Sequence, residues 1–97
     1  MKERIPEPEH EISTKEVLEA YRLSIPEAQE LMVKWMLQKE RKLRGIEDEI
    51  AYKIELAKLS AACGLVEQAI LQLEEALILA RQIGVSRKIR EIQSLPR

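Results

Sequence analysis

The sequence predicts an all-α protein built from antiparallel helical hairpins, with about five helices. Apolar residues recur at spacings of three and four over long stretches, which places them on one face of a helix. The three glycines, at positions 45, 64 and 84, separate these stretches and leave connections of only a few residues. Such short connections join antiparallel neighbours. No segment alternates apolar and polar residues as a strand does.

The length and composition of the chain indicate one folded domain. It has 97 residues, of which 34% are charged and 45% apolar, a mixture typical of folded proteins and unlike that of disordered ones. The formal net charge is -1, so no overall attraction to nucleic acid or to an anionic membrane is expected. The sequence contains neither an apolar run long enough for a membrane span nor a secretory signal, and a cytoplasmic location is expected.

The first twelve residues differ in composition from the rest. They hold two prolines, four glutamates and few residues that could pack, so we expect a flexible acidic tail at 1–12 and a single helical domain at 13–95. His10 lies in this tail between Glu9 and Glu11. A metal site needs convergent ligands that a flexible tail does not hold in place, so a solvated histidine is expected.

Two helix starts in the first half of the chain carry capping signals. Residues 13–16 (STKE) form a capping box, which predicts a helix from about Thr14 to Leu23. Residues 24–27 (SIPE) repeat the signal with a proline in the first turn. They predict a second helix from about Pro26 to Arg44, which Gly45 is expected to end.

The second half predicts two long helices and a short one. Acidic residues at 47–49 favour the positive end of a helix dipole, and a helix follows as far as Gly64. The next helix is expected to close at Gly84, after which Ser86 caps a final short helix that Pro96 stops. The core stripe expected on the longer of these helices consists of Ala69, Ile70, Leu73, Ala76, Leu77, Ala80 and Ile83.

The segment at 57–84, AKLSAACGLVEQAILQLEEALILARQIG, resembles the tetratricopeptide repeat, and the resemblance involves mainly residues 47–84. Gly64 falls at the tight turn of that repeat. The packed positions of its two helices fall on Leu56, Ala57, Ala69, Leu73 and Ala76. Small side chains among them let two helices approach closely, and the large ones fill the gap beside them. The resemblance implies a TPR-like helical hairpin and a role in binding other proteins.

No set of residues predicts an enzyme, a cofactor site or a metal site. Cys63 has no histidine partner other than His10 in the tail, and it is expected to pack as a small apolar residue. The carboxylates at 47–49 and 74–75 are consecutive, so neighbours point in different directions. No glycine-rich phosphate loop is present, and no small-molecule substrate is expected.

Apolar positions remain after each helix has received one core face. Leu71 and Ile78 form a second face on the helix before Gly84, and Val33 and Leu37 form one on the helix before Gly45. A helix with two apolar faces needs two neighbours, and stacked helical repeats need about three units to cover their faces. We therefore predict an adaptor or assembly module that holds a protein partner or, as a homodimer, itself. An accessory subunit stable only within a larger complex is a further reading.

The resemblance also implies a concave binding surface on the helix before Gly64. Its lining residues would be Ala51, Ile54, Lys58, Ala61 and Ala62. This lining is mostly apolar, with one cation and no asparagine, so it fits an apolar helix or a partner subunit better than an acidic peptide end.

The alternative function is that of a small DNA-binding regulator. Residues 80–87 (ARQIGVSR) resemble the turn of a helix-turn-helix motif, which would place Arg87, Lys88 and Arg90 on the reading helix. Residues 81–97 carry five cations and one glutamate. The apolar residues after the turn are out of phase with that motif, which favours protein binding.

Overall fold

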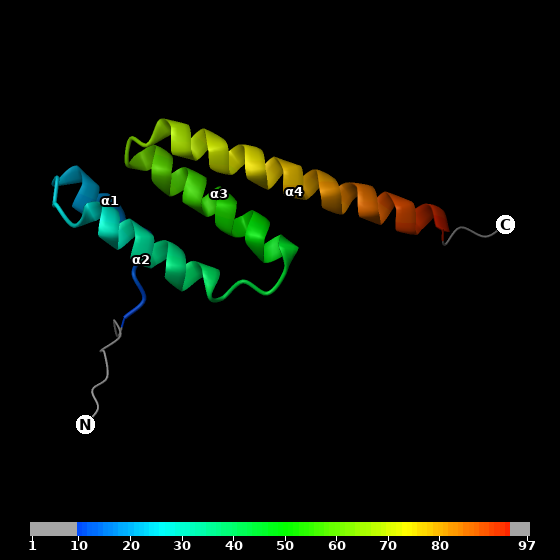
Figure 1. The fold of residues 1–97 in the computed structure, drawn as a ribbon, viewed down its shortest axis with the longest axis horizontal. Helices are drawn as coiled ribbons and strands as arrows, with labels where there is room; N and C mark the ends of the chain where they lie inside the picture. Colours follow the sequence, from blue (N-terminus) through cyan, green and yellow to red (C-terminus); the bar gives the residue numbers. More distant parts are fainter. Residues whose placement is uncertain (1–9, 94–97) are drawn as a thin grey trace, which may run out of the picture. The chain divides into compact units, whose positions relative to one another are not determined.

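A computed structural model describes the backbone of residues 10–93 and their side chains, except those at positions 88, 89, 91 and 92. This part of the chain contains four helices and no strand, which confirms the all-α prediction (Figure 1). The helices are α1 (Thr14–Arg22), α2 (Ala28–Glu40), α3 (Ile46–Ala62) and α4 (Val66–Gln93). Two compact units divide between Arg41 and Lys42, the first holding α1 and α2 and the second α3 and α4. Most of the expected tail, residues 1–9, lies outside the described part, as do residues 94–97.

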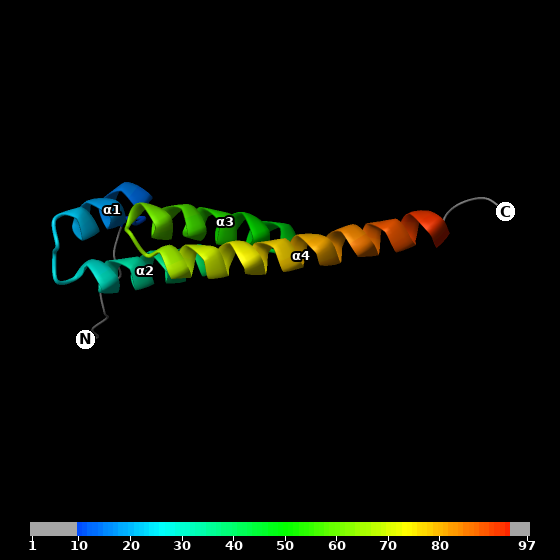
Figure 2. The ribbon, with the colours of Figure 1, turned by 90° about the horizontal axis from the view of Figure 1, so that it is seen from above.

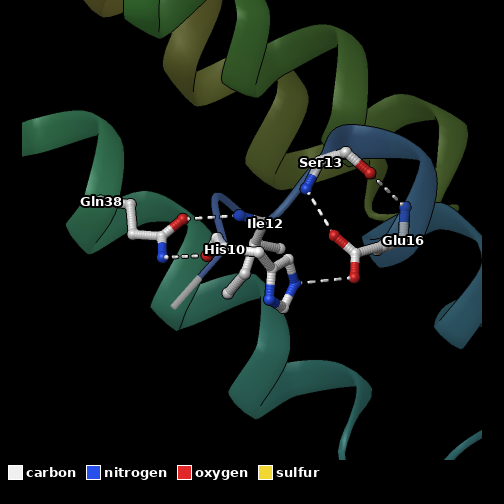
Figure 3. Close-up of polar contacts among 5 residues, drawn as sticks. All are labelled: His10, Ile12, Ser13, Glu16 and Gln38. Atoms are coloured by element: carbon white, nitrogen blue, oxygen red, sulfur yellow. Dashed lines mark hydrogen bonds and ion pairs between the residues drawn. The ribbon is translucent and has the colours of Figure 1, made fainter. Parts of the chain in front are cut away.

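The predicted capping box begins α1. The backbone N–H of Glu16 donates to Ser13 Oγ at 3.1 Å, and the backbone N–H of Ser13 donates to Glu16 Oε1 at 2.8 Å (Figure 3). Two of the N–H groups that every helix start leaves free are thereby satisfied. The first unit forms because α1 packs against α2, and it buries Val17 of α1 and Trp35 of α2 completely.

The segment before α1 is fastened to α2 by one amide side chain. The backbone N–H of Ile12 donates to Gln38 Oε1 at 2.8 Å, and Gln38 Nε2 donates to the carbonyl oxygen of His10 at 3.4 Å (Figure 3). Nε2 of His10 lies 3.0 Å from Oε2 of Glu16, and Ile12 is buried. Residues 10–12 were expected to belong to the flexible tail. They are held because an amide offers both a donor and an acceptor to the same extended segment.

The end of α2 differs from the prediction. This helix ends at Glu40, and Gly45 does not close it but precedes α3 in an extended conformation with φ -179°. Gly45 is instead the N-cap residue of α3, since its carbonyl accepts the backbone N–H of Glu49 at 3.0 Å. The Asp48 side chain also accepts the backbone N–H of Arg44 at 3.0 Å, so the hydrogen bonds around Gly45 belong to the start of α3 and not to the end of α2.

Gly64 forms the turn that was predicted for it. Its φ is +85°, in the left-handed region that glycine adopts without steric cost, and the N–H of Leu65 donates back to the carbonyl of Ser60 at 2.8 Å. The chain reverses there, and α4 runs back alongside α3 in both views (Figures 1 and 2). An ion pair between Lys53 Nζ and Glu75 Oε1, at 2.8 Å, joins the two helices.

Gly84 does not end α4, so the separate short helix expected at Ser86 is part of α4 and four helices replace the expected five or so. A glycine inside a helix costs only about 1 kcal/mol relative to alanine, which the neighbouring residues of a long helix can offset. No reversal of the chain requires a positive φ here, in contrast to Gly64. An ion pair between Arg87 of α4 and Glu47 of α3 links the part of α4 that follows Gly84 to α3.

Two buried alanines test the close approach of α3 and α4. Ala69 and Ala76 are 6% and 4% exposed, so replacing either with leucine should force neighbours apart and lower the free energy of unfolding by about 1–3 kcal/mol. Ala80 is exposed on the same helix, and Ala80→Leu should change stability by no more than about 0.5 kcal/mol. Urea unfolding followed by circular dichroism measures all three. Equal stability of the three variants would contradict the close packing.

The capping box predicts a pH dependence of stability. The pKa of Glu16 lies below its ordinary value, first because its carboxylate accepts the backbone N–H of Ser13 and also because of His10. A pKa lowered by folding stabilises the protein above the unfolded-state pKa, and this contribution is lost as the pH falls through the folded-state value. Glu16→Gln should therefore be less stable than the wild type at neutral pH, with the difference disappearing in acid. Glu19→Gln, on the same helix, is the control, and a pH-independent difference for Glu16→Gln would contradict the assignment.

Candidate interaction surface

The face of α4 that packs against α3 is narrower than the predicted stripe. Its least exposed positions follow spacings of three and four, and they are Ala69, Gln72, Ala76, Leu79 and Ile83. The stripe was therefore right for Ala69, Ala76 and Ile83. It was wrong for Ile70, Leu73, Leu77 and Ala80, which are exposed. Successive helix positions are rotated by about 100°, so these four lie beside the packed face and a single neighbouring helix does not cover them.

The side of α4 away from α3 carries an apolar surface. Seven large aliphatic side chains along the helix are each between 46% and 59% exposed, namely Val66, Ile70, Leu71, Leu73, Leu77, Ile78 and Val85. We call these seven residues the α4 surface. Single exposed aliphatic residues are common on proteins, whereas seven along one helix make a candidate interaction surface.

The α4 surface includes two of the residues that the sequence assigned to a partner, Leu71 and Ile78, at 46% and 52% exposed. The corresponding pair on α2, Val33 and Leu37, is also half exposed, at 51% and 47%. The two pairs belong to different compact units. The other five members of the α4 surface were not predicted to contact a partner, and three of them, Ile70, Leu73 and Leu77, were expected in the core.

The resemblance implied a concave binding surface lined by five residues of α3. All five are exposed and lie along one side of the helix, namely Ala51, Ile54, Lys58, Ala61 and Ala62. The side chains other than Ile54 and Lys58 are methyl groups, so little large aliphatic surface is available there. The α4 surface therefore offers more apolar area than this side of α3.

The basic segment of α4 does not have the geometry of the expected helix-turn-helix. Residues 80–87 are helical throughout, so the turn that the motif requires is absent. Arg87 is exposed and pairs with Glu47, Arg90 is exposed, and the side chain of Lys88 lies outside the described part. A continuous helix has no separate reading helix, so the helix-turn-helix geometry expected at residues 80–87 is wrong.

Cys63 is the one potential nucleophile that the sequence singled out. The side chain is half-buried at the end of α3, and burial raises the pKa of its thiol. A raised pKa reduces the fraction of reactive thiolate at neutral pH, which is the opposite of what nucleophilic catalysis needs. Among residues 10–93, no group of three or more His, Cys, Asp or Glu side chains is placed to hold a metal ion.

Comparison with other proteins identifies no relative. The chain matches no protein-family model, no curated protein and no solved structure. Within the described helices, none is both long enough and apolar enough to cross a membrane.

Gln72 provides a test of how α3 and α4 pack. Its Oε1 is buried without a hydrogen-bond partner, and an unsatisfied buried polar atom costs about 1–3 kcal/mol. Gln72→Met keeps the side-chain length and removes the polar group, so it should raise the free energy of unfolding by about 1 kcal/mol. Gln68→Met, at an exposed position of α4, is the control for helix propensity. A loss of stability in Gln72→Met alone would show that the amide is satisfied after all.

Proposed function

We propose that this protein is a protein–protein interaction module, a TPR-like helical hairpin that acts as an adaptor or assembly factor and associates with itself. The main observation behind the proposal is the α4 surface. Its seven aliphatic side chains remain about half exposed, although the opposite face of α4 already packs against α3. The positive φ at Gly64 and the buried alanines of α4 support the hairpin, since both permit the close helix approach on which that repeat depends.

The energetics of the α4 surface favour association. Full burial of a large aliphatic side chain contributes about 1.5–3 kcal/mol, so a half-exposed one has about half of that still to gain. Seven such residues on each of two copies would contribute about 10–20 kcal/mol. Association costs an estimated 4–15 kcal/mol in lost translational and rotational freedom. The gain from burial exceeds this cost over most of the two ranges, and a net gain of about 8 kcal/mol corresponds to a micromolar dissociation constant.

Sedimentation tests the proposed self-association. The wild-type protein is expected to be a dimer at micromolar concentration, and the double variant Leu71→Lys with Ile78→Lys should shift toward monomer. The two substitutions remove aliphatic area from each copy and add ammonium groups that lose hydration when the surface is covered, whereas in the monomer they stay solvated. Circular dichroism should show unchanged helicity, because both side chains lie outside the α3–α4 contact.

The control for this experiment adds the same charge elsewhere on α4. Gln68 and Gln93 are exposed polar residues outside the α4 surface, and the double variant Gln68→Lys with Gln93→Lys should remain dimeric. A wild-type protein that stays monomeric at high concentration would contradict the proposed self-association.

A further inference from the structure

A line of charged residues runs along the middle of the exposed side of α4. Glu67, Glu74 and Arg81 follow at intervals of seven, and Lys88 continues the series in the sequence. Seven residues make almost two helical turns, so these positions lie on one side of the helix. Glu67, Glu74 and Arg81 are exposed. Neither Glu74 nor Arg81 has an ion pair within the described part of the chain.

Aliphatic members of the α4 surface flank this line. The helical positions place Ile70 and Leu77 on one side of Glu74, and Leu71 and Ile78 on the other. A partner that covers the α4 surface must therefore also cover Glu74. A covered charge needs an opposite charge within reach, because an unpaired buried carboxylate is strongly unfavourable.

The charges of α4 change sign along its length. Residues 66–80 contain three glutamates and no cation, whereas residues 81–93 contain four cations and one glutamate. A second α4 in the opposite direction would set the acidic half of each helix beside the basic half of the other. A parallel copy would instead set like charges together.

We infer that the α4 surface binds the same surface of a second copy of this chain, with the two α4 helices antiparallel and the two-fold axis between Leu77 and Ile78. This inference rests on the self-association proposed above. In this register Glu74 of each copy lies opposite Arg81 of the other. Ile70 lies opposite Val85, and Glu67 lies opposite Lys88 by sequence position. The interface is closed, because each copy presents the same residues to the other.

An open hollow on α4 fits this register. It is lined by Ile78, Arg81, Gln82, Val85 and Ser86. The second copy would present Leu77, Glu74 and Ile70 to Ile78, Arg81 and Val85 of this hollow. Aliphatic side chains thus meet aliphatic side chains on both sides of an ion pair. A nucleic acid fits this surface less well, because the phosphate backbone would meet the glutamates of the first half.

Charge reversal tests the register. Glu74→Arg and Arg81→Glu should each raise the dimer dissociation constant at least tenfold, because each places two pairs of like charges at the interface. The double variant Glu74→Arg with Arg81→Glu restores opposite charges in the antiparallel register, so its dissociation constant should return to within about threefold of the wild type. Gln68→Arg, off the charged line, is the control and should leave dimerisation unchanged. Each variant is checked for wild-type helicity by circular dichroism.

Cysteine cross-linking provides a second measurement in a Cys63→Ser background. A mixture of Ile70→Cys and Val85→Cys proteins should form a disulfide-linked dimer of the two variants, whereas Ile70→Cys alone should not link to itself. Self-linking of Ile70→Cys would indicate parallel helices and overturn the inference. A wild-type monomer overturns both the inference and the proposed self-association. A dimer that Leu71→Lys with Ile78→Lys disrupts, but that neither charge-reversed single variant weakens, overturns the register alone.

Discussion

The close contact between α3 and α4 determines what the rest of the second unit can do. It depends on a reversal of the chain at Gly64, where φ is +85°, and on small side chains at Ala69 and Ala76. These alanines give α4 a narrow packed face, since they have little surface to bury. Seven large aliphatic residues of α4 lie outside that face. The same feature that brings the two helices together therefore leaves most of the apolar surface of α4 exposed.

The local signals were the part of the fold that could be predicted. The capping box at Ser13 and the turn at Gly64 both involve residues a few positions apart, so their chemistry is visible in the sequence. Gly84 was mispredicted because a glycine permits a helix end without requiring one. At Gly64 the chain must reverse and the glycine adopts a positive φ, whereas at Gly84 nothing outside the helix favours an end.

The candidate surface was predicted only in part, and the reason is the composition of α4. Periodicity identifies a helix reliably, but a helix with aliphatic residues on several sides does not indicate which side meets its neighbour. Leu71 and Ile78 were correctly placed outside the α3–α4 contact, while Leu73 and Leu77 were assigned to it. Gln72 lies within the packed face although it is polar. The fastening of residues 10–12 was also missed, since Gln38 is 26 positions from Ile12.

The ion pairs within the second unit explain which charges of α4 remain for a partner. Glu75 forms an ion pair with Lys53, and Arg87 forms one with Glu47. One charged residue from each half of α4 is therefore paired with α3. Glu74 and Arg81 are left on the outward side, each flanked by aliphatic residues. In the proposed dimer their pairing would lie near the two-fold axis, where the surrounding side chains exclude water and salt screens it less than a pair at the rim. Apolar area would then supply most of the affinity, and this central pair would select the antiparallel direction.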